Sequence, residues 1–204
     1  PNIVTLHDRG EHQGRLWITM EYVEGIDADH LLSSRGPMPF PLAHSLISGA
    51  GAALDYAWRK HRITHRDVKP ANILLALDDS TALNDASSEF TVEAVKLADF
   101  GIAKAAEEAT SLTSTGITIG TLAYISPEAI EGDRVDNRSD IYSLGCTAFH
   151  LLTGQPPFTA GSVTALMSAH LHLQPPPVTD LAPHVPVAVD SVLARVLAKN
   201  PDQR

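Results

Sequence analysis

The segment His65–Asn72, which reads HRDVKPAN, contains three kinds of side chain that can take part in chemistry. Asp67 supplies a carboxylate, Lys69 a cation and Asn72 an amide oxygen, and a second carboxylate, Asp99, follows a short apolar run. Phosphoryl transfer needs such a set: a carboxylate near the incoming hydroxyl, a cation on the phosphate and oxygen ligands for Mg²⁺. The sequence therefore predicts phosphoryl-transfer chemistry at two separate loops.

The elements that position these loops are predicted from apolar periodicity. Short β-rich runs at 3–6 and 16–20, joined by the polar loop HDRGEHQG, predict a hairpin, and further strands are expected at 73–75 and 95–98. Helices are predicted at 27–36, from 41 to 57, at SPEAI, and at 139–152, 162–172 and 186–198. EYVEG is expected to be a linker, and the expected class is α+β, with a small β portion leading into a larger helical portion.

The segment 76–94 is acidic, rich in Ser and Thr, and lacks clear periodicity. No Lys or Arg occurs between Pro70 and Val95, whereas five acids do. This composition predicts an exposed loop insertion. A phospho-acceptor or docking role for the segment is the alternative interpretation.

The composition, with 44% hydrophobic and 19% charged residues, is that of a globular protein. The net charge of −9 argues against a nucleic-acid partner, because such a partner requires clustered cations. The lone cysteine, Cys146, excludes an internal disulfide and indicates a buried thiol in a reducing cytoplasm. No run reaches the about 18 apolar residues that span a bilayer. The chain starts at Pro1 and stops at Arg204 without a helix stop signal, so we expect a piece cut at both ends.

Four motifs follow one another in a characteristic order: HRDVKPAN, DFG at 99–101, SPE at 126–128 and SDIYSLG at 139–145. They resemble the catalytic loop, the metal-binding loop, the A-P-E signature and the start of the central helix of the eukaryotic-type (Hanks-type) serine/threonine protein kinases. MEYVEG, ISPEA and the QPPP stretch look most like the bacterial members. The resemblance implies a protein-kinase-like fold, with a partial N-lobe and hinge at 1–24, a C-lobe at 25–204 and an activation segment at 99–128.

The resemblance also implies roles for the residues of the two loops. Asp67 would be the catalytic base that accepts the proton of the acceptor hydroxyl, and Lys69 would contact the γ-phosphate of ATP. Asn72 and Asp99 would bind Mg²⁺ or Mn²⁺. Thr121, in GTLAY, would bridge Asp67 and Lys69. Lysine two residues after Asp67 is typical of serine/threonine members, so the implied substrates are proteins with Ser or Thr acceptors.

A nucleotide site is implied by MEYVEG and NILL. Met20 would stand at the back of the adenine pocket, and the backbone of Glu21 and Val23 would meet the adenine edge. Asp27 would reach the ribose, and Leu74 would pack beneath the ring. The alternative is ordinary core for Met20 and Leu74 and a helix N-cap for Asp27.

The Thr-rich stretch SLTSTGITIG suggests regulation. In kinases resembling this chain, cations such as Arg66 and Lys104 meet a phosphate on the activation segment, and a phosphothreonine can order a loop against them. We expect autophosphorylation at Thr115 first and Thr113 second. The alternative is a loop that is simply polar.

Two interactions are expected to support the site. Asp140 would accept hydrogen bonds from the backbone of the catalytic loop, beneath a column of Leu6, His65 and Phe100.

The second supporting interaction would be a pair between Glu128 and Arg204. The other histidines, including His170 and His172, are expected at the surface.

The family also has a Gly-rich loop, a strand lysine and a helix glutamate, and no G-x-G-x-x-G occurs in this chain. We therefore expect the chain alone to bind ATP poorly, within a parent protein that is active. The interval from Asn72 to Asp99 exceeds the usual one, which the loop insertion explains. Three other interpretations stay open: an inactive kinase-like scaffold, a small-molecule phosphotransferase and a truncated remnant. A membrane anchor is expected only outside residues 1–204.

Overall fold

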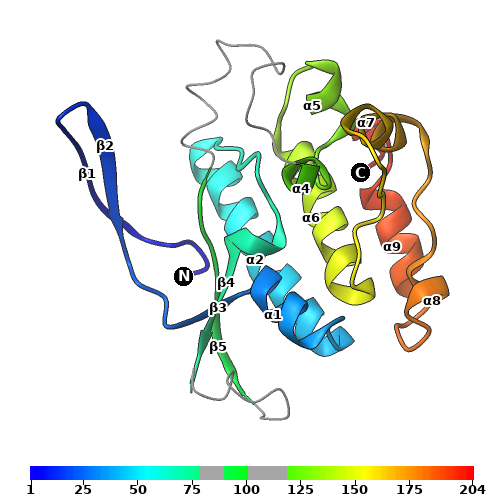
Figure 1. Cartoon of the computed structure of the whole chain (residues 1–204), viewed down its shortest axis with the longest axis horizontal. Helices are drawn as coiled ribbons and strands as arrows, with labels where there is room; N and C mark the ends of the chain where they lie inside the picture. The colour runs from blue at the N-terminus through cyan, green and yellow to red at the C-terminus, as the bar shows by residue number, and fades with distance from the viewer. Residues whose placement is uncertain (79–89, 101–118) are drawn as a thin grey trace.

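A computed structural model describes residues 1–78, 90–100 and 119–204 of the chain. Near the N-terminus, β1 (Leu6–His12) and β2 (Arg15–Met20) form an antiparallel hairpin that extends away from the helices (Figure 1). Gln13 and Gly14 make its turn with positive φ angles of 52° and 74°, which suit a two-residue hairpin. The prediction of a hairpin is confirmed, but its bounds are wrong: β1 begins at Leu6 instead of spanning 3–6, and the predicted loop at 7–14 is shorter. Most of that loop is strand. The sequence did not indicate this, because a hairpin exposed along nearly its whole length does not require apolar alternation.

The second sheet is antiparallel and has the order β3 (Gly25–Asp27), β4 (Ile73–Leu77) and β5 (Val92–Leu97). Strand β3 was not predicted, since EYVEG was expected to be a linker. It pairs with β4 so closely that a Cβ on Gly25 would lie 1.9 Å from the Leu75 carbonyl oxygen, and Gly25 has φ 155°. Both ends of the predicted insertion 76–94 belong to the β4–β5 ladder, and residues 79–89 of it lie outside the described residues.

Two helices, α1 and α2, pack with this sheet. Helix α1 (Ala28–Arg35) begins at Asp27, whose side chain accepts a hydrogen bond from the His30 N–H at 2.8 Å. Helix α2 (Phe40–His61) buries one face against β5 and against α6 (Asn137–Thr153), as Figure 1 shows. The apolar residues that predicted α2 recur every three or four positions and form this face: Leu46, Ala50, Ala53, Leu54 and Ala57.

Shorter helices complete the fold beyond the sheet: α4 (Ile119–Leu122), α5 (Pro127–Glu131), α7 (Val163–His172), α8 (Val178–Leu181) and α9 (Ala188–Val196). Helices α5, α7 and α9 were predicted, whereas α4 and α8 were not, because a single helical turn carries almost no periodic signal. The predicted α+β class, with a small β portion and a larger helical portion, is confirmed (Figure 1). Among the described residues, no helix is both long and apolar enough to cross a membrane.

Two predictions about single residues have opposite outcomes. Cys146 is buried in α6, as expected. His170 is not a surface residue: it is fully buried on α7, with Nδ1 3.0 Å from the Tyr142 hydroxyl. Its burial arises because Tyr142 and Phe158 close over the ring. No pattern around His170 in the sequence identifies these neighbours.

Candidate active site

The segment between α2 and β4 brings three of the predicted side chains together. The Lys69 ammonium donates to Asp67 Oδ2 at 2.9 Å. The Asn72 amide nitrogen donates to the Asp67 backbone oxygen at 2.7 Å and to Oδ2 at 3.3 Å. These contacts arise because a 3₁₀ turn at Pro70–Asn72 folds the amide back over Asp67. They fix the orientation of the Asp67 carboxylate.

Asp140, in the first turn of α6, holds this loop from below. One carboxylate oxygen accepts the His65 N–H and the other accepts the Arg66 N–H, both at 2.8 Å. Arg66 has a φ of 67°, an unfavourable angle for a residue other than glycine, so the loop needs such external support. Burial raises the pKa of Asp140 to about 6, although the two backbone donors favour the charged form.

Asp99 reaches the same region from the end of β5. The residue before it is tied to the loop twice: the Ala98 N–H donates to the Asn72 carbonyl at 2.9 Å, and the Ala98 carbonyl lies 2.8 Å from His65 Nε2. Asp99 itself is exposed and has a φ of 57°. The fold thus holds the two expected metal ligands, Asn72 and Asp99, on adjoining strand ends.

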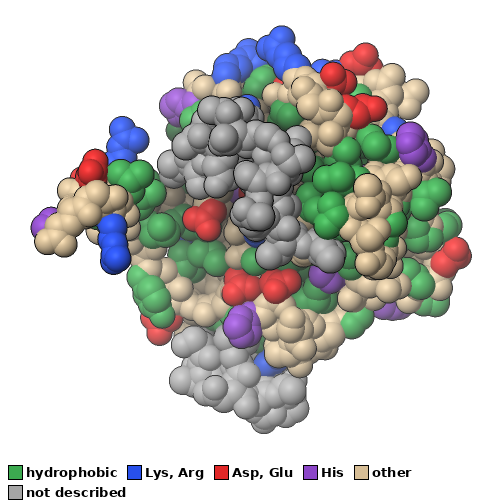
Figure 2. Space-filling model, turned by 45° about the horizontal axis from the view of Figure 1, so that its top comes forward, with side chains coloured by type: hydrophobic (Ala, Val, Ile, Leu, Met, Phe, Trp, Pro, Cys, Tyr) green, Lys and Arg blue, Asp and Glu red, His purple; other side chains and the backbone are tan. Residues whose placement is uncertain are grey.

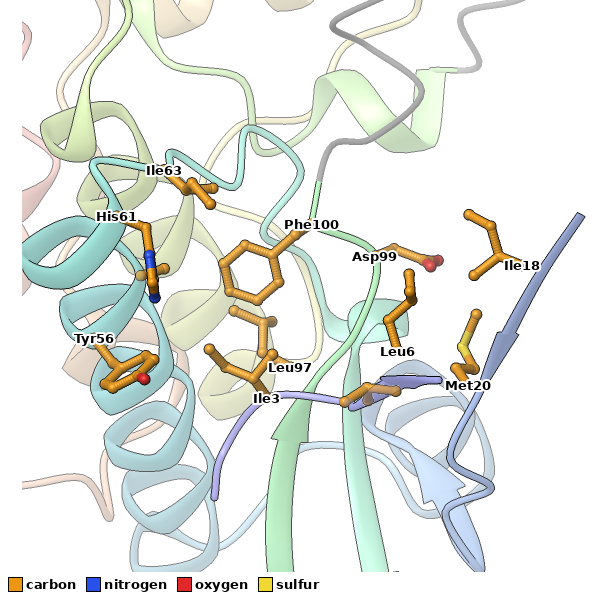
Figure 3. A pocket seen from close by; sticks show the side chains of 12 residues that line it. Ile3, Leu6, Ile18, Met20, Tyr56, His61, Ile63, Leu97, Asp99 and Phe100 are labelled. Carbon is orange, nitrogen blue, oxygen red and sulfur yellow. The ribbon is translucent and has the colours of Figure 1, made fainter. Parts of the chain in front are cut away.

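A hollow of about 250 Å³ lies beside Asp99, between the hairpin and α2. Its lining is mainly apolar and includes Leu6, Met20 and Phe100 (Figure 3). The Phe100 ring packs on His65 with centroids 4.6 Å apart, so these two members of the expected column are in contact. In Figure 3, Leu6 lies on the Asp99 side of the hollow, away from the Phe100 ring, and its contact with Phe100 stays a prediction.

The expected nucleotide residues lie along β2, β3 and β4. Glu21 pairs with Lys96 at 2.7 Å, and the hydrogen bond from Lys96 lowers the pKa of this carboxyl. The Glu21 N–H donates to the Thr5 carbonyl at 2.9 Å, and the contact of the Glu21 backbone with an adenine edge stays a prediction.

The remaining nucleotide residues are partly exposed or lie at the surface. Leu74 stands opposite Asp27 in the β3–β4 ladder, and Val23 precedes β3. Asp27 caps α1, so the N-cap interpretation describes its contact. Met20 is 47% exposed, which does not match ordinary core. On the face drawn in Figure 2, acidic side chains are exposed near the centre of the molecule.

Glu128 of SPE and Arg204, which are far apart in sequence, meet at the base of α5. The guanidinium donates to both carboxylate oxygens, at 2.7 and 2.9 Å, and both side chains are buried. Burial pushes the pKa of Glu128 upward, but the hydrogen bonds from Arg204 and Ser139 outweigh it and keep the pKa below its usual value. The pair fixes α5, which follows the expected acceptor region, to the end of the chain.

Some expected site residues lack described side chains. Lys104, Thr113 and Thr115 lie outside the described residues, and of Thr121 only its place in α4 is described.

One polar contact was missed by the sequence analysis. The Tyr124 hydroxyl lies 2.7 Å from His150 Nδ1 on α6. Burial lowers the pKa of His150, whereas the charge of Asp29 on α1 acts to raise it. The contact joins the segment just after GTLA to α6. A histidine in an otherwise apolar helix run was the available signal.

Comparison with known proteins shows the family of the chain. The family model described as the protein kinase domain matches residues 1–204. The chain belongs to the protein kinase family. This kinase domain is 44% identical over 206 residues to the serine/threonine-protein kinase PknF of Mycobacterium tuberculosis and 45% identical to PknJ of the same species. Both alignments cover the whole chain, but only 41% of PknF and 33% of PknJ.

A solved structure agrees with the fold of this kinase domain. The crystal structure of the Mycobacterium tuberculosis PknI kinase domain matches with a TM-score of 0.70 and 34% identity. The match covers all of this chain and 66% of that one. The predicted protein-kinase-like fold is therefore confirmed.

The donor set of the kinase domain fits Mg²⁺. Asn72 uses its amide nitrogen on Asp67, so its oxygen Oδ1 remains as an acceptor, and Asp99 adds a carboxylate on the adjoining strand end. Among the described residues, no group of three His, Cys, Asp or Glu is arranged for a metal ion. Two oxygen ligands suit Mg²⁺, which takes its remaining ligands from water and substrate phosphates.

Proposed function

We propose that the protein transfers the γ-phosphate of ATP to Ser or Thr hydroxyls of other proteins. The observation that carries the proposal is the meeting of two chain segments: Lys69 and Asn72 both donate to Asp67, and the residue before Asp99 is hydrogen-bonded to the same loop. The family membership and the names of PknF and PknJ support the same reaction.

Each residue has a physical task in this reaction. Asp67 accepts the proton of the acceptor hydroxyl while the hydroxyl oxygen attacks the γ-phosphorus. The bond from phosphorus to the ADP oxygen then breaks. Lys69 offsets negative charge on the transferring group. Asn72 and Asp99 would hold Mg²⁺, which neutralises the phosphates and orients them. Asp140 keeps the loop in place through the backbone of His65 and Arg66.

The test is transfer of labelled phosphate from ATP to a generic protein substrate by the full-length protein. We expect Mg²⁺-dependent transfer that EDTA abolishes, with phosphoserine and phosphothreonine but no phosphotyrosine after hydrolysis. Absence of transfer by a folded full-length protein would instead favour the inactive scaffold. Transfer to aminoglycosides or choline alone would favour the small-molecule phosphotransferase.

We further propose that activity is regulated by autophosphorylation at Thr115, followed by Thr113. Arg66 lies directly before Asp67, so a phosphate bound by Arg66 and Lys104 would order the activation segment beside the catalytic loop. Mass spectrometry of the active protein should find phosphate on Thr115. Alanine at Thr115 and Thr113 should remove most of it, while alanine at Thr118 should not. Active enzyme with none of these threonines modified would refute the proposal.

The substrates that we propose are proteins rather than nucleic acids, consistent with the net charge of −9. We place the domain in the cytoplasm, where ATP is abundant, with any membrane anchor outside residues 1–204.

A further inference from the structure

A second cluster of titratable side chains lies away from the catalytic loop, where α6, α7 and the residues after α9 meet. Tyr142 and His170 are fully buried there, with the tyrosine hydroxyl 3.0 Å from His170 Nδ1. Lys199 Nζ lies 3.5 Å from the same hydroxyl. The cluster plays no part in the phosphoryl-transfer site described above.

The chemistry of these groups sets the direction of the hydrogen bonds. An ammonium can only donate, so the Tyr142 oxygen accepts a hydrogen bond from Lys199. The Tyr142 O–H then donates to His170 Nδ1. The hydrogen of the neutral imidazole is then on Nε2, a buried atom that has no hydrogen-bond partner within the part of the chain that the structure describes. Among the described residues, the cluster therefore has one donor without an acceptor and no anion.

The ammonium of Lys199 makes cation–π contacts with aromatic rings instead of an ion pair with a carboxylate of the described residues. It lies 4.3 Å from the centroid of Phe158 and 5.7 Å from that of Tyr142. The Arg204 guanidinium lies over the same Tyr142 ring, at 4.8 Å. Across residues 1–78, 90–100 and 119–204, no carboxylate comes within 4.0 Å of Lys199, although Lys69 and Lys96 each have one.

Burial and the charge of Arg204 favour the neutral amine of Lys199, against the aromatic contacts, which favour the ammonium. Burial lowers the pKa of Lys199 to about 8, and the charge of Arg204 acts in the same direction, against an opposing contribution from Cys146. The other groups that face it, Tyr142 and His170, are both uncharged near neutral pH, since burial raises the pKa of Tyr142 and lowers that of His170 to about 4. With a pKa near 8, about a quarter of the side chain is amine at pH 7.5, against about one part in a thousand for a solvated lysine.

We propose that Lys199 is a modification site at which the protein accepts small acyl groups from activated donors, either acyl phosphates or acyl thioesters. The amine nitrogen attacks the carbonyl carbon, and the carbon–oxygen bond to phosphate, or the carbon–sulfur bond, breaks. The leaving group takes the electron pair, the proton from nitrogen passes to water, and a neutral amide remains. Lys199 is partly exposed, which allows a small donor to reach it.

The modification would act next to the pair that anchors α5. Arg204 donates from Nη2 both to the Lys199 carbonyl, at 3.0 Å, and to Glu128. Lys199 and Arg204 both lie over the Tyr142 ring, and acylation removes the charge of Lys199. Acylation thereby removes a like-charge repulsion beside the Glu128–Arg204 pair.

The expected rate follows from two opposing effects. The larger amine fraction raises the acylation rate of Lys199 over that of a solvated lysine by about 200-fold at pH 7.5. The lower nucleophilicity of a less basic amine reduces this advantage by about 10- to 20-fold. We therefore expect Lys199 to be acylated on the order of tenfold faster than an exposed lysine. The comparison residue is Lys60, which is exposed in the last turn of α2.

The experiment treats the purified full-length protein with acetyl phosphate in one arm and acetyl-coenzyme A in the other, from pH 6.5 to 9.5. Peptide mass spectrometry follows acetylation of Lys199 and Lys60. We expect Lys199 to react faster than Lys60, with half of its maximal rate near pH 8. A faster reaction in either arm supports the proposal, and that arm identifies the donor. In urea the advantage of Lys199 should disappear, because it depends on the folded surroundings. The control Lys199→Arg should leave acetylation of Lys60 unchanged.

Two results would overturn the proposal. One is acetylation of Lys199 no faster than that of Lys60 in both arms. The other is an advantage of Lys199 that persists in urea, which would assign the reactivity to the local sequence instead of the aromatic and cationic surroundings.

Discussion

Asp67→Asn is expected to lower the rate of phosphate transfer by about 10²–10⁴-fold, the usual cost of losing a general base. The substitution keeps the size of the side chain but removes the basic oxygen and the charge that faces Lys69 Nζ at 2.9 Å. The measurement is the initial rate of transfer from ATP to a protein substrate, with kcat and the KM for ATP determined separately. Because Asp67 receives the acceptor proton, the loss should appear in kcat and not in the KM for ATP.

A matched control is Asp55→Asn. Asp55 is an exposed carboxylate on α2, paired with Arg59 one turn away, so its loss should leave the rate unchanged. Thermal unfolding of both variants checks that the fold is intact. Equal activity of Asp67→Asn and the unsubstituted protein would refute the assignment of the base.

Arg204→Met is expected to reduce the free energy of unfolding by about 3–5 kcal/mol, because it leaves the Glu128 carboxylate buried without its cation. All five N–H groups of Arg204 are used. Nη1 and Nη2 each donate to one oxygen of Glu128, and the remaining three N–H groups donate to the backbone carbonyls of Arg138, Ala198 and Lys199. Urea unfolding of the variant and the unsubstituted protein gives the difference.

Three further variants sharpen this prediction. Arg204→Lys should also be costly, since an ammonium has three donors and no planar fork. Adding Glu128→Gln to Arg204→Met should restore part of the loss by removing the unpaired charge. Arg195→Met, at an exposed position on α9, should change the free energy of unfolding by less than about 0.5 kcal/mol. A loss below about 1 kcal/mol for Arg204→Met would contradict a stabilising role for the pair.

Local features of this chain could be predicted from the sequence because their causes lie within a few residues. Asp67, Lys69 and Asn72 belong to one short segment, so their chemistry was recognisable before their contacts were known. The long helices α2 and α6 followed from apolar spacing. The α7 cap at Ser162 is likewise local, since its side chain bonds a backbone N–H three residues later.

Some features that depend on distant partners and belong to no motif were not predicted. The length of the β1–β2 hairpin and the existence of β3 depend on strand pairing, which leaves little trace in polar segments. The burial of His170 depends on Tyr142 and Phe158, which come from other parts of the chain. Neither the polarity of His170 nor its spacing on α7 indicates whether those rings cover it.

The sequence by itself determined which side chains are candidates for chemistry, because residue type and close spacing are local properties. That distant side chains meet was expected only from the resemblance to a family, and the tertiary structure supplies the contacts themselves. The β4–β5 ladder brings Asp99 beside Asn72, and Asp140 and Arg204 reach their partners across more than 70 positions. Such contacts form because burial in a common core offsets the entropy lost in closing long loops, and that balance belongs to the whole chain.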